Sequence, residues 1–257
     1  MRRRIHPGHT GRERWRAIAR AVVSLGFVLL AGCGTASDTP PSAAPPATLE
    51  GINEPFLSPD LEIGEWIERF EGESREIFAE REAIVAALGL RSGSRVADVG
   101  AGTGFFSALF AREVGPDGIV YAVEISPKFL EHLRERKALL GLDGLRVVEG
   151  TRDSVELPPD SIDVAFVCDV YHHFEAPAAS LASLHRALRP DGTLVVIDFE
   201  RIPGKSPDWI LEHVRAGREV FQAEIEAAGF ELVEAVEIDG IEQNYVLRFR
   251  RAAAPAS

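Results

Sequence analysis

The chain has 257 residues, of which 46% are hydrophobic, and its formal net charge at pH 7 is −12. Its length and composition fit one globular domain with a sizeable core and some additional segments. The first 32 residues carry seven arginines and one glutamate, so the remainder is more acidic than the whole chain, which argues against binding to the phosphate backbone of a nucleic acid.

The N-terminal residues have the three parts of a secretory signal. Arginines come first, an apolar run over residues 21–30 follows, and small residues precede Cys33. The apolar run is shorter than the about 20 residues that a membrane-spanning helix needs. We therefore expect residues 1–32 to be a signal peptide.

The sequence Leu-Ala-Gly-Cys that ends at Cys33 resembles the lipobox of bacterial lipoproteins. The resemblance implies that Cys33 is lipidated and holds the protein on the exported side of the inner membrane or on the outer membrane. Residues 33–51, rich in Pro, Ala, Ser and Thr, are then a lipid-anchored flexible linker, and residues 252–257 a disordered tail. An uncleaved anchor, or a signal of another type, is the alternative.

Residues 52–251 alternate between helical and strand-like patterns. Two amphipathic helices are predicted first, at 62–70 and 74–88, and strands at 95–99, 119–124, 145–149, 162–168 and 193–198 follow, separated by helices at 105–114, 127–140 and 178–188. Nearly continuous apolar strands between helices indicate a parallel sheet covered on both faces. After a helix at 217–228, strands at 230–238 and 244–250 flank a short turn and predict an antiparallel hairpin.

The loop after the first strand carries the strongest functional pattern. Asp98 precedes Gly100, Gly102 and Gly104, a helix begins at once, and Glu124 closes the next strand. Glycines placed between a strand and a helix, with an acid one β-α-β unit later, indicate a nucleoside-cofactor site. Phe105 stands where a dinucleotide-binding motif would have its third glycine, so that class of site is disfavoured.

This loop, with its preceding acid, resembles the first motif of class I S-adenosylmethionine-dependent methyltransferases, and the similarity extends over residues 61–251. The resemblance implies an α/β fold: a Rossmann-like sheet of seven strands, mostly parallel with a C-terminal antiparallel hairpin, under an N-terminal helical lid. It also implies S-adenosylmethionine as cofactor. The implied contacts to its methionine part and ribose are Asp98, Gly100, Ala101, Gly102, Gly104, Glu124 and Ile125.

The segment after the third strand contains Thr151, Arg152 and Asp153. In the family a carboxylate here commonly accepts a hydrogen bond from the adenine amine, beside a backbone amide that meets the ring. The resemblance makes Asp153 the candidate, although many relatives carry the acid at the position of Thr151. A solvated acid in a turn is the alternative.

The segment after the fourth strand contains Asp169, Tyr171, His172 and His173, where the family places the methyl-donor end of the cofactor. We expect Asp169 to accept a hydrogen bond from the cofactor or the substrate, and the other three to orient or deprotonate a nucleophile. Alternatively, one histidine caps the next helix and the other packs beneath it. Adjacent histidines in an extended segment point apart and no third ligand is evident, so no metal is expected.

The sequence thus predicts a lipid-anchored S-adenosylmethionine-dependent methyltransferase. It would transfer the methyl group directly to a small or membrane-associated acceptor, of a quinone-like or phenolic kind. Two alternatives stay open. An exported domain is separated from the compartment that makes the cofactor, which favours a non-catalytic module that binds S-adenosylmethionine as a sensor. Aminopropyl transferases share the fold, but they typically place more acids around their substrate channel.

Overall fold

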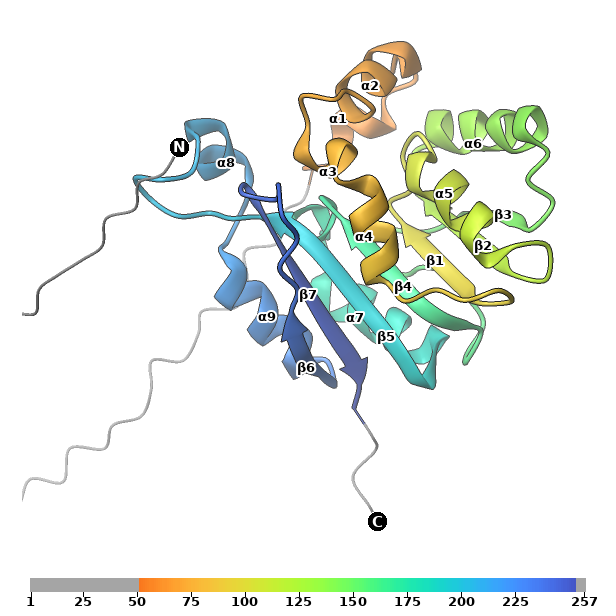
Figure 1. Cartoon of the computed structure of the whole chain (residues 1–257). Coiled ribbons are helices and arrows are strands. Elements are labelled where there is room, and N and C mark those ends of the chain that lie inside the picture. Colours follow the sequence, from red (N-terminus) through yellow and green to blue (C-terminus); the bar gives the residue numbers. More distant parts are fainter. Residues whose placement is uncertain (1–50, 253–257) are drawn as a thin grey trace, which may run out of the picture. The chain divides into compact units, whose positions relative to one another are not determined.

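The computed structural model describes residues 51–252 (Figure 1). The chain divides into two units, Met1–Pro45 and Pro46–Ser257. The expected signal peptide lies outside the described residues, as do the expected linker and tail except for residues 51 and 252. Within residues 51–252, no helix is both long enough and apolar enough to span a bilayer.

A seven-stranded sheet forms the centre of the fold, with the strand order β3-β2-β1-β4-β5-β7-β6. β1 to β5 run parallel to one another, and β7 runs antiparallel to both β5 and β6, which confirms the predicted fold class. The strands are β1 (Arg95–Val99), β2 (Ile119–Glu124), β3 (Leu145–Glu149), β4 (Ile162–Cys168), β5 (Leu188–Phe199), β6 (Phe230–Ala235) and β7 (Asn244–Arg251). The strand order reverses between β1 and β4, where the carboxyl ends of parallel strands leave a crevice for a ligand.

Helices cover both faces of this sheet (Figure 1). They are α1 (Glu54–Leu57), α2 (Ile63–Phe70), α3 (Glu76–Ala79), α4 (Arg81–Ala87), α5 (Phe105–Val114), α6 (Pro127–Leu140), α7 (Pro177–Ala187), α8 (Asp208–His213) and α9 (Arg218–Ala227), with a 3₁₀ turn, η1 (Tyr171–His173). One core joins the sheet to α3–α6, and the other joins it to α7–α9. Successive residues of β4 point to opposite faces of the sheet: Phe166 packs in the core with α3–α6, and Val167 packs in the core with α7–α9.

Local sequence signals set the ends of α6. The hydroxyl of Ser126 accepts from the backbone N–H of Phe129 at 3.5 Å, and Pro127 occupies the first helical position. Gly141 ends the helix in the left-handed conformation, with φ at 63°. These caps place α6 at the boundaries that its sequence predicts.

Some element boundaries differ from the sequence-based expectation. The segment 74–88 forms two helices, α3 and α4, which meet at Glu80. β5 begins at Leu188 and β6 ends at Ala235, whereas the sequence predicts 193 and 238. The short helices α1 and α8 were not predicted, because elements of 4 and 6 residues contain too little periodicity to detect.

Candidate active site

A cavity of about 1070 Å³ lies at the carboxyl ends of the parallel strands. Its walls come from the loops after β1 to β5 and from α1, α2 and α8. Clefts of about 300–1,000 Å³ hold drug-sized ligands, so this one has room for a nucleoside cofactor and part of a second molecule. Because α1 and α2 line the cavity, the N-terminal helices occupy the place expected of a lid.

The three glycines of the loop between β1 and α5 adopt positive φ angles, of 71°, 52° and 76° for Gly100, Gly102 and Gly104. A Cβ atom on Gly100 would lie 2.6 Å from the side chain of Val170, and one on Gly104 would lie 2.5 Å from Leu133. Both glycines therefore permit tight packing. Gly102 lines the cavity, where an added Cβ would meet no atom closer than 3.6 Å, and it leaves backbone open to a ligand.

Glu124, at the end of β2, joins this loop to the strand. Its Oε2 accepts from the N–H of Gly102 at 2.9 Å, and its Oε1 accepts from those of Ile125 and Ser126 at 2.7 and 2.9 Å. Burial raises the pKa of Glu124, while the three N–H donors oppose that effect. Since Oε1 already accepts two bonds, Oε2 is the atom with a lone pair left for a hydroxyl group.

Asp98 lies on the cavity wall at the end of β1 and is almost fully buried. Its Oδ2 accepts a hydrogen bond from the hydroxyl of Ser107 at 2.6 Å. Burial raises the pKa of Asp98 to about 7, and the nearby carboxylate of Glu124 adds to the rise. A buried acid with that pKa is well placed to respond to a cationic ligand.

The segment after β3 is divided between the cavity and the solvent. Thr151 and Arg152 line the cavity, and Arg152 binds the carboxylates of Glu54 and Glu175, each at 2.9 Å. Asp153 does not line it: this residue is exposed and its carboxylate accepts from the hydroxyl of Thr151 at 2.7 Å. The expected adenine-binding role of Asp153 therefore has no support from its position.

Asp169 follows β4 with φ at 53°, a conformation that costs energy in any residue except glycine. Its Oδ1 accepts from the side-chain amide of Asn244 at 2.5 Å, and its Oδ2 forms an ion pair with Arg75. The cavity wall thus includes Asp169 as expected, but both carboxylate oxygens bind protein groups. The residue joins β4 to β7 and to the segment between α2 and α3.

The structure corrects the expectation for Tyr171. The side chain is fully buried and is not part of the cavity wall. Its hydroxyl donates to Glu224 of α9 at 2.9 Å, and Arg215 binds the same carboxylate. Tyr171 therefore points into the core between η1 and α9, away from any nucleophile in the cavity.

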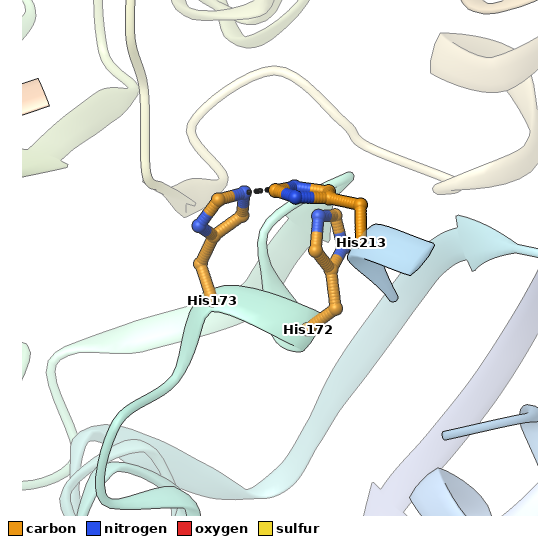
Figure 2. Close-up of side chains that lie close together, drawn as sticks. All are labelled: His172, His173 and His213. Atoms are coloured by element: carbon orange, nitrogen blue, oxygen red, sulfur yellow. Dashed lines mark hydrogen bonds between the residues drawn. The ribbon is translucent and has the colours of Figure 1, made fainter. Parts of the chain in front are cut away.

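His172 and His173 lie side by side at the cavity wall, with their ring centroids 4.3 Å apart, and His213 at the end of α8 lies against both (Figure 2). The Nε2 atoms of His173 and His213 are 3.3 Å apart. The expectation that the two adjacent rings diverge is wrong, because η1 is a 3₁₀ turn and not an extended segment. The alternative that one of the two histidines caps the next helix also has no support, because no side chain among residues 51–252 caps the start of α7.

The protonation of these rings differs. Burial lowers the pKa of His173 to about 2, and repulsion by His172 and His213 contributes, so His173 is neutral at pH 7. Burial also lowers the pKa of His213. For His172 burial alone would lower the pKa, but the bond of Nδ1 to Asp198 Oδ1, at 2.8 Å, and the charge of that carboxylate raise it.

The sequence analysis missed two residues of this region: Asp198, which is fully buried and binds His172, and His213, which lines the cavity. Asp198 ends β5 just as Asp98 ends β1 and Glu124 ends β2, so the rule that ligands bind at strand ends would have identified it. His213 had no such signal, since it lies on a short helix 40 residues after His173. Aromatic side chains form the remaining apolar wall: Phe56, Trp66, Phe70, Phe129, Phe199 and Trp209.

Comparisons with known proteins agree with this geometry. A family model described as methyltransferase domain matches residues 90–251. The ubiquinone/menaquinone biosynthesis C-methyltransferases UbiE of Marinomonas sp. and Pasteurella multocida are 29% and 32% identical to this chain. Those alignments cover 46% and 44% of this chain and 47% and 42% of the relatives, so the chain spans about half the length of the curated relatives that it matches.

Solved structures show the same fold. A SAM-dependent methyltransferase from Aquifex aeolicus is similar with a TM-score of 0.66 and 24% identity, over 75% of this chain and all of that protein. The [4+2]-cyclase SpnF is similar with a TM-score of 0.59 and 18% identity, over 68% of this chain and 82% of that protein. Since a cyclase shares the architecture, the fold alone does not define the reaction.

Proposed function

We propose that this chain, which belongs to the methyltransferase-domain family, is an S-adenosylmethionine-dependent methyltransferase that methylates a small or membrane-associated acceptor by direct transfer. The main support for the proposal is that the cavity is continuous. The same cavity is lined by the glycine loop with Asp98 and Glu124, by aromatic side chains and by the three histidines. A cofactor and an acceptor can therefore meet without crossing solvent.

The residues of the loop fit the cofactor. Gly102 exposes backbone where a larger side chain would project into the cavity, and the free lone pair of Glu124 Oε2 can accept from a ribose hydroxyl. Asp98 offers a buried carboxylate to the positively charged methionine part. When bound, S-adenosylmethionine supplies a methyl group already activated by its sulfonium, so the protein needs mainly to align the acceptor and exclude water.

The acceptor part of the cavity favours an apolar ring. Phe56 and Trp66 pack with ring centroids 4.8 Å apart, and Phe199 and Trp209 pack 5.0 Å apart. Flat aromatic walls suit a phenolic or quinone-like molecule by area burial and ring stacking. The name of the UbiE relatives, which refers to ubiquinone and menaquinone biosynthesis, supports the same class of acceptor, and this chain's own acceptor is part of the proposal.

A titration of the full chain in detergent with S-adenosylmethionine, followed by assays with phenols and reduced quinones, tests the function. We expect binding, and release of S-adenosylhomocysteine with at least one acceptor. Binding without turnover would favour the sensing module, and absence of binding at millimolar cofactor would contradict both functions. Gly102→Ala should weaken binding, whereas Gly141→Ala, which has a similar φ of 63° but no atom within 4 Å of the added Cβ, should not.

We also propose that the lipidated Cys33 holds the enzyme at a membrane. The support is the signal-like sequence before Cys33, together with an acceptor class that partitions into lipid. Cys33→Ser should release the protein from the membrane fraction, while Cys168→Ser, the matched change at the half-buried thiol of the cavity wall, should leave it there. Retention of Cys33→Ser in membranes would contradict the lipid anchor and favour an uncleaved helix.

A further inference from the structure

We propose that His172, His173 and His213 form a binding site for a divalent transition-metal ion, with zinc as the best match. One ligand atom from each ring lies within 4.8 Å of the others. Figure 2 shows the three rings converging from η1 and from the end of α8. Neutral imidazole is a preferred ligand of zinc and of the neighbouring transition metals.

The spacing of two ring nitrogens fits tetrahedral coordination. Zinc binds histidine nitrogen at about 2.0–2.1 Å, so two ligands at the tetrahedral angle lie about 3.3–3.4 Å apart. The Nε2 atoms of His173 and His213 are separated by 3.3 Å. The same separation also permits one direct N–H···N hydrogen bond, so the distance needs support from the third ring.

That support comes from Asp198. This carboxylate is fully buried, accepts from the backbone N–H of His172 at 3.0 Å and binds the Nδ1 atom of its ring at 2.8 Å. A carboxylate on one ring nitrogen fixes the orientation of the ring and directs the other nitrogen, Nε2, to a metal ion, which binds there in place of a proton. A histidine bound to metal nearly always has such a partner.

In the part of the chain that the structure describes, His173 lacks such a partner, so its ring is available to a metal ion but is held by packing alone. Its Nδ1 atom is buried without a hydrogen-bond partner among residues 51–252, and its Nε2 atom meets only His213. No carboxylate or backbone group of the described residues holds this ring through a hydrogen bond, whereas Phe56 packs edge-on against it with a centroid distance of 5.4 Å. Packing therefore positions the ring, and a bound metal ion would give the ring nitrogens that face one another in the cluster a common partner.

Three protein ligands leave a fourth position, the arrangement of catalytic zinc sites. All three histidines line the cavity, so that position is open to a small molecule in it. A hydroxyl group bound there would have a lowered pKa and would lose its proton to solvent, leaving a more nucleophilic oxygen. This role for the ion, unlike the site itself, rests on the proposed function.

Metal binding to the full chain in detergent, cleared of metal with a chelator, tests the site. We expect one zinc ion per chain by calorimetry, and visible absorption bands of tetrahedral Co²⁺ when cobalt replaces zinc. His213→Ala removes a ligand from an exposed position and should weaken zinc binding by about 100-fold or more. Asp198→Asn should weaken it by about 10- to 100-fold and shift the cobalt bands. His132→Ala, a histidine of α6 outside the cluster, is the matched control.

Absence of cobalt bands and of zinc uptake with metal in excess would overturn the site, as would equal affinities of His213→Ala and the unchanged chain. Azide should alter the cobalt bands by entering the fourth position, and unaltered bands would overturn the open position. Zinc binding is measured without cofactor or acceptor. A chain that binds zinc but methylates no acceptor therefore contradicts only the proposed function, and a chain that binds zinc but keeps full activity without it contradicts only the role of the ion in the reaction.

Discussion

The contact between Glu124 and the cofactor ribose can be tested with Glu124→Gln. In the structure Oε1 accepts two backbone N–H groups and Oε2 accepts one, from Gly102. A glutamine keeps the size of the side chain, and its oxygen can take the place of Oε1. Its NH₂ group then faces the N–H of Gly102, so two donors meet and no acceptor remains for a ribose hydroxyl.

The expected loss follows from these bonds. Removing the charge-assisted hydrogen bond from a ribose hydroxyl to Oε2 costs about 2–3 kcal/mol, which raises the Kd for S-adenosylmethionine by about 30- to 160-fold. The unpaired N–H of Gly102 in a buried site costs about 1–3 kcal/mol of folding free energy. The variant should therefore bind more weakly and also unfold at lower urea concentration than the unchanged chain.

Isothermal titration and urea unfolding separate the two effects. Glu149→Gln is the matched control, because Glu149 is the register partner of Glu124 on β3 and is exposed to solvent. We expect both properties of this control to match the unchanged chain. An unchanged Kd in a folded Glu124→Gln variant would refute the assignment of the ribose hydroxyls to Glu124.

Three further predictions concern the same region. The pKa of Asp98 is about 7, and a cationic cofactor favours its ionised form. The affinity for S-adenosylmethionine should therefore rise as pH increases through about 7. A series of titrations at different pH should show this rise for the unchanged chain and not for Asp98→Asn. Gly104→Ala places a Cβ atom 2.5 Å from Leu133 at a φ of 76° and should cost about 2 kcal/mol in urea unfolding; equal stability would contradict the packing role. Arg75→Ala leaves the carboxylate of Asp169 buried without its cation and should lower the free energy of unfolding by about 3 kcal/mol. Proteolysis of residues 51–75 should also become faster. An unchanged cleavage rate would contradict the role of this ion pair in holding the lid.

Local sequence was sufficient for the fold and the cofactor loop. Strand runs, the positions of the glycines and the acids at Asp98 and Glu124 are features of consecutive residues, and a strand–turn–helix unit places them without help from the rest of the chain. The parallel sheet then brings the strand ends together. For this reason Asp98, Gly102 and Glu124 lie on the cavity wall as the sequence analysis expected.

The acceptor side was decided by tertiary structure. Whether Tyr171 or His172 reaches the cavity depends on the direction of a 3₁₀ turn, and the turn directs Tyr171 to Glu224 and His172 to Asp198. His213 comes from a short helix 40 residues after His173, so nothing in the sequence near either residue signals their contact. The sequence by itself therefore determined the fold and the loop of the cofactor site, because these depend on local spacing, and only the packing of distant segments decided which side chains form the histidine cluster.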